Sequence, residues 1–410
     1  MASPTERGGL AQARALDEAD PLRAFRDRFL IADDELVYLD GNSLGRLPLD
    51  TEARLAQVAA HQWGERLIRA WGERWMELPE RLGDRLGSAL LGAAPGQVAV
   101  ADSTTVCLYK LASAALAARA DRREIVTDRD NFPTDRYVLE GLAAERGLTI
   151  RWIEADSRAG PSPEDVAAVT NENTALVCLS HVSYKSAFIL DLAEITRVAH
   201  GAGALTIWDL CHSVGAVPVS LDEDAVDLAV GCTYKYLNGG PGAPAFLYVR
   251  SEHQGRLRQP IWGWLGRREP FEMAQGFEPG EGISAMRSGT PPILSLIGVE
   301  AGVELVIEAG IDAIRAKGIA LTQNVIDLAD RLLSPLGVEV GSPRDARRRG
   351  AHVALVHPDA RQLSARLIAG GVIVDFRAPD VIRVGLSPLS TSFTEAWRGI
   401  ERLRELLSGG

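Results

Sequence analysis

The stretch 228-LAVGCTYKYLNGGPG-242 indicates both the fold and the chemistry of this 410-residue chain. It starts with an apolar run of strand length, and Lys235 lies four positions after that run ends. The glycine-rich segment from Asn238 to Gly242 follows, and glycines allow unusual dihedrals and close backbone approach to a ligand. Ligands bind beyond the carboxyl ends of strands in open α/β sheets. The stretch therefore predicts a ligand site that contains an amine.

The sequence around this stretch predicts an α/β fold. Between residues 98 and 249, short apolar runs alternate with segments of helical periodicity, for example 106–118, 135–145 and 192–200. This alternation is typical of a mostly parallel sheet with helices on both faces. The seven expected strands are Val98–Ala101, Glu124–Thr127, Thr149–Ile153, Ala175–Leu179, Ala204–Trp208, Leu228–Gly231 and Ala245–Tyr248.

The last third of the chain predicts a smaller α+β unit. After Pro291-Pro292, a long helical pattern runs from Leu294 to Leu333. Four short strands near 338–340, 352–356, 372–375 and 381–385 and a terminal amphipathic helix over 394–407 follow. We therefore expect an N-terminal segment (1–50) near the small domain and the active site, a large domain (51–292) and a small C-terminal domain (293–410).

Composition excludes several function classes. Lys+Arg number 44 against 55 Asp+Glu, and this net charge of −11 argues against nucleic acid as a partner. The four cysteines lack metal-ligand spacing, so we expect reduced, buried thiols and no metal site. No apolar run approaches the ~18 residues of a membrane span, and the N-terminus lacks an export signal. The sequence predicts a cytoplasmic protein without a membrane partner. The arginine cluster at 344–349 is expected to be a solvated loop, with an anion site as the alternative.

Lysine is scarce, so few side-chain amines are available for chemistry. The chain has four lysines. Lys317 lies in a pattern typical of an exposed helix, Lys110 is expected along a helix flank, and Lys185 lacks a glycine-rich turn. Lys235 alone combines a strand end with such a turn and is a candidate for Schiff-base chemistry, which requires a neutral amine.

Asp209 directly follows the predicted strand 204–208 and precedes Lys235 by 26 residues. His212 is close to Asp209 in sequence. An aspartate at a strand end most often caps a turn. A carboxylate beside a Schiff-base lysine is, however, what pyridoxal phosphate requires, because it keeps the pyridine nitrogen protonated. The positions therefore predict a pyridoxal phosphate site, with capping as the alternative for Asp209.

Two further strand ends carry side chains that fit this cofactor. Ser103, Thr104 and Thr105 precede a predicted helix, and hydroxyls with free N–H groups at a helix start suit a phosphate or act as a helix cap. Phe132 follows another strand, where its ring could stack on a planar cofactor or pack in the core.

These residues resemble the fold-type-I pyridoxal phosphate enzymes of the class V aminotransferase type, and the motifs around them resemble the kynureninase family. The matching motifs occur in family order over about residues 35 to 390. They are Tyr38–Gly45, Asp102–Val106, Asn131–Asp135, Asp209–Ser213, Thr233–Gly242, Gly263–Gly266, Gly289–Ile293 and Ile382–Leu389.

The resemblance implies a role for each residue of the site. Lys235 would hold pyridoxal 5'-phosphate as an aldimine and move the substrate Cα proton, while Asp209 pairs with the pyridine nitrogen. Tyr234 would bind phosphate and assist proton transfer, and Arg383 would bind the substrate α-carboxylate through two hydrogen bonds. The implied cofactor contacts are Thr104, Thr105, Phe132, Asp135, Ser180, Asp209, His212, Tyr234, Lys235, Trp264 and Thr290, with Asn42, Ser43 and Trp71 near the substrate.

The resemblance also implies a homodimer with active sites at the interface, where Trp264 and Thr290 reach the phosphate of the partner subunit's site. The implied reaction is hydrolysis of the Cβ–Cγ bond of L-kynurenine, or its 3-hydroxy derivative, to anthranilate, or 3-hydroxyanthranilate, and L-alanine. This chemistry belongs to tryptophan catabolism and NAD biosynthesis.

Some features leave alternatives open. Cys107, Arg267 and Ser390 depart from the family pattern and leave the ring substituent of the substrate, and a biosynthetic role, undecided. An aminotransferase or lyase acting on a substituted aryl amino acid, or a pyridoxal-phosphate-binding homologue without catalysis, remain alternatives. A cysteine desulfurase is disfavoured, because it needs a reactive cysteine late in the chain and none follows Cys232.

Overall fold

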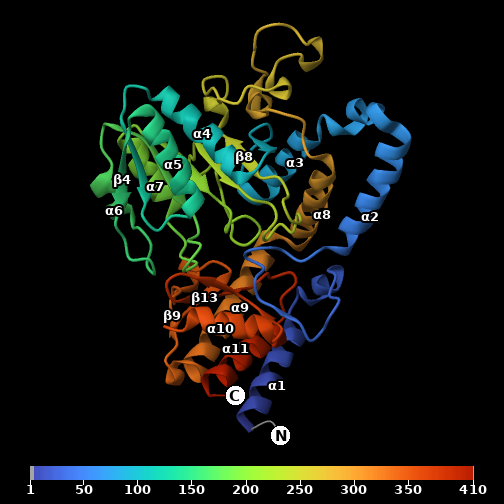
Figure 1. Ribbon diagram of the computed structural model, residues 1–410, viewed down its shortest axis with the longest axis vertical. Helices are drawn as coiled ribbons and strands as arrows, with labels where there is room; N and C mark the ends of the chain where they lie inside the picture. Colours follow the sequence, from blue (N-terminus) through green and yellow to red (C-terminus); the bar gives the residue numbers. More distant parts are fainter. Residues whose placement is uncertain (1–3, 410) are drawn as a thin grey trace.

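The computed structural model describes residues 4–409; residues 1–3 of the expected N-terminal segment, and residue 410, lie outside them. Two sheets organise the molecule. We call the part built on the seven-stranded sheet the large domain and the part built on the four-stranded sheet the small domain (Figure 1). No helix among residues 4–409 has the length and apolar character needed to cross a membrane.

The large sheet has the strand order β2-β8-β7-β6-β5-β3-β4, and only β8 runs antiparallel to its neighbours. The strands are β2 (Val98–Val100), β3 (Glu124–Asp128), β4 (Thr149–Ile153), β5 (Thr174–Ser180), β6 (Leu205–Asp209), β7 (Leu228–Gly231) and β8 (Phe246–Val249). All seven predicted strands are present, each within one residue of its expected ends. The mostly parallel α/β sheet is confirmed.

Side chains alternate between the two faces of this sheet because successive strand residues point in opposite directions. On β6, Leu205 and Ile207 join the core beneath α4 (Thr104–Ala118) and α5 (Pro133–Arg146). Trp208 joins the core on the other face. The helices that pack there are α2 (Leu49–Gln57), α3 (Leu78–Leu86), α6 (Pro163–Val169), α7 (Leu192–Gly201) and α8 (Ile293–Ala309).

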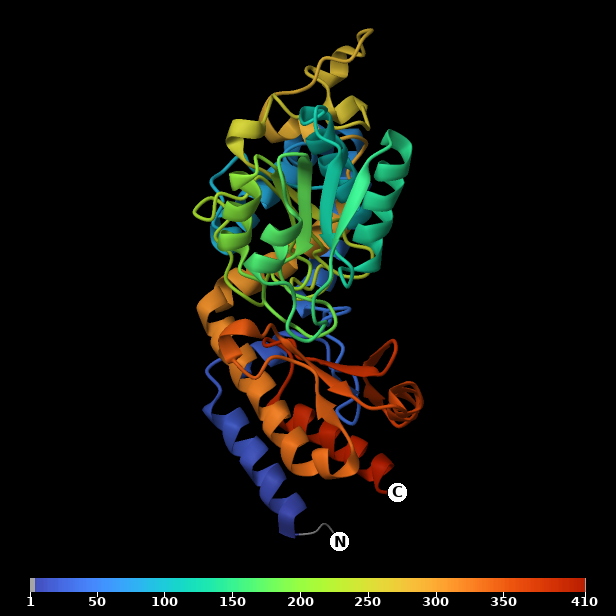
Figure 2. The same ribbon diagram turned by 90° about the vertical axis from the view of Figure 1, so that its left-hand side faces the viewer.

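The small domain has an antiparallel sheet in the order β12-β13-β10-β9. Its strands are β9 (Glu339–Val340), β10 (His352–Val356), β12 (Asp375–Arg377) and β13 (Val381–Gly385), and its helices are α9 (Ile311–Leu332), α10 (Ala360–Ala369) and α11 (Phe393–Leu407). The N-terminal segment adds α1 (Pro4–Ala19), which lies beside α9 and α11, and β1 (Val37–Tyr38), which pairs with β11 (Val372–Ile373) (Figure 2).

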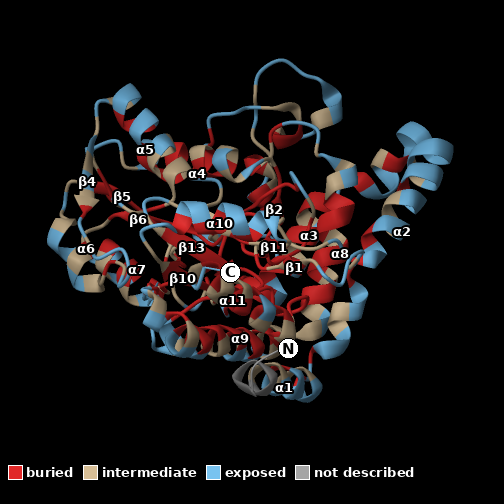
Figure 3. Ribbon diagram, turned by 60° about the horizontal axis from the view of Figure 1, so that its bottom comes forward, coloured by how far each residue is buried: buried red, intermediate tan, exposed pale blue. Residues whose placement is uncertain are grey.

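The long helical pattern expected over 294–333 is two helices, because Gly310 adopts a φ of 78° and ends α8. α8 contributes Leu296 and Val299 to the large-domain core, whereas α9 contributes Leu321 and Val325 to the small-domain core. The proposed domain limits stay a prediction. Buried residues concentrate on the strands and inner helix faces, whereas most of α2 is exposed (Figure 3).

Burial overturns two expectations about basic residues. Lys317 is 6% exposed, not on the surface, and its Nζ lies 2.6 Å from a carboxylate oxygen of Asp20. Arg349 of the cluster expected in solvent is fully buried and donates to the carbonyl oxygen of Pro343 at 2.7 Å, whereas Arg347 is exposed. Asp20 lies far from Lys317 in sequence, and Arg349 also donates from Nη2 to Oε1 of Gln323 at 3.0 Å, so each has a partner outside the local pattern that predicted exposure. The four cysteines are buried and unpaired, as expected.

Candidate active site

Lys235 and Asp209 lie at neighbouring strand ends. Asp209 is the last residue of β6, and Lys235 follows β7, which pairs with β6 in parallel. The Nζ of Lys235 lies 3.3 Å from Nε2 of His212 and 5.8 Å from the ring centroid of Phe132. Lys235 is 8% exposed, so its amine has little contact with solvent. Burial and the charge of Lys235 hold the pKa of His212 well below its usual range, which leaves a neutral imidazole.

Asp209 has a second buried carboxyl beside it. Asp135 lies in the first turn of α5, and burial, the charge of Asp209 and a hydrogen bond to Asp209 raise its pKa well above the usual range. Within residues 4–409, Oδ2 of Asp135 has no hydrogen-bond partner. Asp209 also caps its turn, since Oδ1 accepts from the N–H of Cys211 at 2.7 Å. A cation between these carboxyls would relieve their repulsion, and the protonated ring nitrogen of pyridoxal phosphate fits this requirement.

Phe132 and Ser180 are held together by a residue that the sequence analysis did not single out. Asn131 Oδ1 accepts from the N–H of Phe132 at 2.8 Å and from Oγ of Ser180 at 2.7 Å. The ring of Phe132 packs edge-on against Tyr184, with centroids 5.3 Å apart. Phe132 and Asn131, which follow β3, and Ser180, which ends β5, are therefore connected to one another beside Lys235.

The start of α4 is open for an anion. Ser103 caps the helix, its Oγ accepting from the N–H of Val106 at 3.4 Å. Thr104 is half-buried and Thr105 is exposed. Their role at a phosphate stays a prediction, and the capping alternative holds for Ser103.

The N-terminal segment passes against the lysine loop. The N–H of Gly45 donates to the carbonyl oxygen of Tyr234 at 2.8 Å, and a Cβ at Gly45 would lie 2.4 Å from the carbonyl oxygen of Lys235. This close approach requires glycine. Tyr234 itself is half-buried, and burial followed by the charges of Cys232 and Cys211 raises the pKa of its phenol. Its phenol is therefore protonated at neutral pH.

Arg383 connects the two domains. It lies on β13, and its Nη1 donates to the carbonyl oxygen of Tyr184 in the large domain at 2.7 Å. Its Nη2 donates to Oγ of Ser43 at 3.0 Å. Asn42 is fully buried, and neither atom of its amide has a hydrogen-bond partner in the described part of the chain. Arg383, Ser43 and Asn42 thus gather where the sequence analysis expected substrate.

Three predicted residues lie apart from this group. Trp264 donates from Nε1 to Oγ1 of Thr290 at 3.3 Å, in the segment between β8 and α8 that projects from the large domain away from the small domain (Figure 1). Trp71 packs edge-on against Trp75, with ring centroids 5.4 Å apart, in the helical region between α2 and α3. Their proposed contacts with cofactor or substrate stay predictions.

The structure adds site residues that the sequence analysis missed. Asp375 on β12 forms an ion pair with Arg383, and Arg377 on the same strand forms an ion pair with Asp375. His352 on β10 is fully buried, with its ring centroid 5.6 Å from that of His212. Burial, then the charge of Arg383, lowers the pKa of His352 to about 3. Period-2 alternation along the predicted strands 352–356 and 381–385 was the signal that could have placed His352 and Arg383 on a common face.

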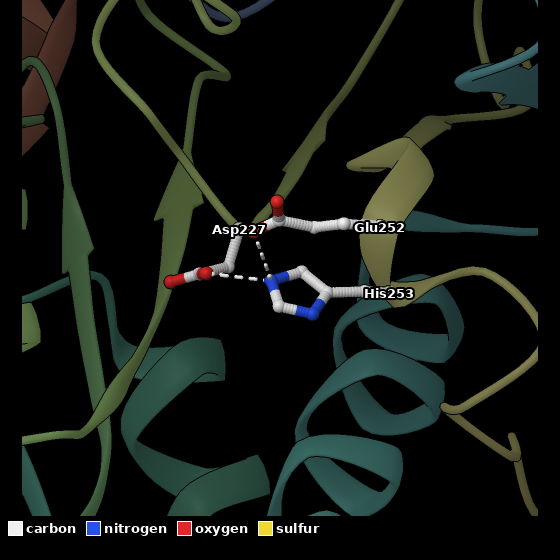
Figure 4. Close-up of side chains that lie close together, drawn as sticks. All are labelled: Asp227, Glu252 and His253. Carbon is white, nitrogen blue, oxygen red and sulfur yellow. Dashed lines mark hydrogen bonds and ion pairs between the residues drawn. The ribbon is translucent and has the colours of Figure 1, made fainter.

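A separate polar cluster lies at the opposite ends of the central strands from Lys235, just before β7 begins. Asp227 accepts from Nε2 of His200 at 2.8 Å and lies 2.7 Å from Nε2 of His253, which also approaches Glu252 (Figure 4). Asp227 also accepts from the N–H and hydroxyl of Thr206. These hydrogen bonds satisfy the buried carboxylate and tie β6, α7 and the segment after β8 together.

Known proteins match this chain over nearly its whole length. The kynureninase of Burkholderia pseudomallei is 42% identical over 97% of this chain and 95% of its own length, and that of Pseudomonas fluorescens is 42% identical over 96% and 94%. The chain belongs to the kynureninase family. A family model described as the kynureninase C-terminal domain matches residues 314–403, which include the whole small-domain sheet of this kynureninase family member.

Solved structures confirm the fold class. A cysteine desulfurase from Thermococcus onnurineus NA1 superimposes with a TM-score of 0.79 at 20% identity, covering 92% of this chain and 96% of that one. A cystine C-S lyase in complex with cysteine persulfide gives 0.80 at 19% identity, covering 91% and 98%. At such identity these likenesses concern the fold alone, which is that of fold-type-I pyridoxal phosphate enzymes.

Proposed function

We propose that this chain hydrolyses the Cβ–Cγ bond of L-kynurenine, or of a ring-substituted kynurenine, and releases an anthranilate and L-alanine. The observation that carries the proposal is the 42% identity to kynureninases over 97% of the chain. The cofactor is pyridoxal 5'-phosphate, which when bound supplies a protonated pyridine ring that withdraws electrons from bonds at the substrate Cα.

The large domain would hold this cofactor from several strand ends. Lys235 would bind it covalently, and Asp209 would pair with its ring nitrogen. Phe132 would stack on the ring, since an aromatic face packs well on a planar heterocycle. The polar side chains proposed to contact its periphery and phosphate are Thr104, Thr105, Asp135, Ser180, His212 and Tyr234.

Proton transfer would depend on Lys235 and its neighbours. The neutral imidazole of His212, 3.3 Å from Nζ, can accept a hydrogen bond from the lysine amine and orient it toward the substrate Cα. The phenol of Tyr234, which its raised pKa keeps protonated, can donate a hydrogen bond in the same site. Lys235 would therefore move the proton, and Tyr234 would assist by this hydrogen bond.

Substrate binding would use the junction between the domains. Arg383 would bind the α-carboxylate, and its contact with the carbonyl oxygen of Tyr184 places that anchor at the large-domain site. Asn42, Ser43 and Trp71 are proposed neighbours of the substrate. Burial of Arg383 and Asn42 limits water around the α-carboxylate and strengthens its interaction with the guanidinium.

A homodimer would complete each site, with Trp264 and Thr290 reaching the partner's phosphate. The exposed Thr290 and the projecting segment that carries it support this proposal. Mixing Lys235→Ala protomers with Trp264→Ala protomers tests it, because a hybrid dimer regains one intact site and the mixture about a quarter of wild-type activity. Activity equal to the mean of the two parents would contradict it. The four buried, unpaired cysteines support a cytoplasmic location.

The activity itself is tested by incubating the cofactor-loaded protein with L-kynurenine and 3-hydroxykynurenine. We expect fluorescent anthranilate or 3-hydroxyanthranilate and an equal amount of L-alanine. The ratio of the two rates decides the ring substituent, which the departures of Cys107, Arg267 and Ser390 from the family pattern leave open. Formation of a keto acid instead of alanine would identify an aminotransferase, and cofactor binding without any product would identify a homologue without catalysis.

A further inference from the structure

The small-domain sheet turns a polar face toward the large domain. Alternation along its strands sends one set of side chains into the small-domain core and the other set to the opposite face. The core set includes Val353, Leu355, Ile382 and Val384. The opposite set includes His352, Asp375, Arg377 and Arg383, and Arg383 reaches the large domain through Tyr184.

Within this face, Asp375 lies directly across from Arg383 in the register of β12 and β13. Arg383 donates from Nε to Oδ1 of Asp375 at 2.7 Å and from Nη2 to Oδ2. Its side chain is 2% exposed and that of Asp375 is 15% exposed. Asp375 therefore occupies the Nε–Nη2 edge of the guanidinium, one of the two edges that can bind a carboxylate bidentately.

The other edge of the guanidinium, between Nη1 and Nη2, faces neutral groups. Nη2 donates to Oγ of Ser43 at 3.0 Å, and this hydroxyl in turn donates to Oδ2 of Asp375 at 3.0 Å. Nη1 donates to the carbonyl oxygen of Tyr184 at 2.7 Å. A substrate carboxylate can replace a neutral hydroxyl there, whereas displacing Asp375 would leave a partly buried anion without its main partner. The Nη1–Nη2 edge is thus the one that remains for a substrate.

The charges around Asp375 also favour an incoming anion. Nη2 of Arg377 lies 2.6 Å from Oδ2 of Asp375, so two guanidinium groups share one carboxylate. Burial alone would raise the pKa of Asp375, but the hydrogen bond and charge of Arg383, aided by Arg377, bring it below the usual range. The Arg377–Asp375–Arg383 triad therefore carries one positive charge that it does not itself neutralise.

We propose that Asp375 is the positioning residue of the substrate-carboxylate site: it fixes Arg383 by the Nε–Nη2 edge so that the Nη1–Nη2 edge faces the α-carboxylate. Arg377 pairs with Oδ2 of Asp375 as well and helps to hold this carboxylate in place. The proposal rests on the proposed function for the identity of the substrate, but its subject is recognition of an amino-acid carboxylate. Asp375 acts through Arg383 and does not itself touch the substrate.

The test uses cofactor-loaded wild-type and Asp375→Asn protein and two kinds of probe. L-Alanine carries the carboxylate, and kynuramine is kynurenine without its carboxylate; binding of each is followed by the change in the cofactor's absorbance. We expect the Kd of L-alanine and the KM of L-kynurenine to rise roughly 10- to 100-fold, as loss of a charge-assisted hydrogen-bonded pair predicts. The Kd of kynuramine and kcat should change by less than about threefold, within the spread of a neutral substitution.

Controls separate positioning from folding. Asp380→Asn removes a carboxylate in the turn between the same two strands and should leave all constants unchanged. Asp375→Glu keeps the charge and should bind L-alanine more tightly than Asp375→Asn; it also serves as the test if the asparagine variant does not fold.

Three outcomes would overturn the proposal. Tighter L-alanine binding by Asp375→Asn would mean that Asp375 competes with the substrate for Arg383. Equal weakening of L-alanine and kynuramine would mean a general structural role, and unchanged binding of both would mean none. Failure of the proposed function is seen separately, as wild-type protein that binds L-alanine and does not cleave kynurenine.

Discussion

Asp135 in the large domain and Asp375 in the small domain are both carboxyl groups with little solvent contact, yet their pKa values move in opposite directions. Burial and the adjacent Asp209 raise the pKa of Asp135, and only Lys235 opposes them. For Asp375, two arginines overcome burial and lower the pKa. In the large-domain half, the charge of Lys235 is thus too small to offset burial and the paired carboxyls, whereas in the small-domain half two arginines outweigh one carboxylate.

This difference matches what each half is proposed to bind. A pyridine ring that becomes protonated brings a cation to the Asp209–Asp135 pair. A substrate α-carboxylate brings an anion to the arginines. Each half is electrostatically incomplete without its ligand, and the ligands are of opposite charge, which favours one orientation of an amino acid across the domain junction.

The largest expected effect comes from removing the amine of the large-domain half. Lys235→Ala should lower kcat about 10³-fold or more, because both the covalent anchor and the proton-transfer group are lost. The visible absorbance of the wild-type holoenzyme should disappear as well. Lys185→Ala is the matched control, since that lysine pairs with Asp130 at 2.9 Å and is expected to leave the spectrum unchanged. A Lys235→Ala protein that is still yellow and active would contradict the assignment of Lys235 as the amine of the large-domain half.

The second prediction separates the two members of the carboxyl pair. Asp209→Asn removes the charge proposed to hold the ring nitrogen protonated, so kcat should fall about 10²-fold. Asp135→Asn should cost less than about tenfold, because its raised pKa makes the carboxyl neutral and an amide can still donate to Asp209. The two variants are compared by their steady-state kcat at neutral pH. Equal losses would mean that both carboxyls are needed as anions.

The third prediction concerns the small-domain half. Arg383→Lys keeps the charge but loses the fork of donors, so KM for L-kynurenine should rise roughly 10- to 100-fold while kcat changes little. Arg361→Lys is a matched control, because Arg361 packs on the ring of Phe376. A lower kcat at unchanged KM would place Arg383 in the chemical step instead.

Local sequence patterns predicted one half of the site better than the other. In the large sheet, each strand coincides with a short, mostly apolar run in the sequence. The strand ends, and Asp209 and Lys235 at or after them, could therefore be located from the local sequence alone. Asp375 was missed because its partnership with Arg383 depends on the register of two paired strands. The same limit explains Lys317, whose partner Asp20 is almost 300 residues away. A helical period cannot reveal a partner that tertiary packing supplies.

The smallest expected effect concerns Asp40, which borders the small-domain half. Burial, then the charge of Asp375, raises its pKa to about 6, while Ser43, Arg383 and Arg377 oppose the shift. Below pH 6 this carboxyl is neutral; above pH 6 its charge offsets the excess positive charge of the arginines and weakens attraction for the α-carboxylate. KM should therefore rise with pH by a few-fold, because solvent and the nearby arginines screen most of the repulsion between Asp40 and the α-carboxylate.

The measurement compares wild type with Asp40→Asn, which stays neutral at every pH. Titration of the substrate amine and of the cofactor affects both proteins alike, so it cancels in the ratio of their KM values. That ratio should rise between pH 5 and pH 7.5 with a midpoint near 6. A flat ratio would mean that Asp40 ionises outside this range or that the arginines do not sense its charge, and the excess positive charge would then belong to the Arg377–Asp375–Arg383 triad alone.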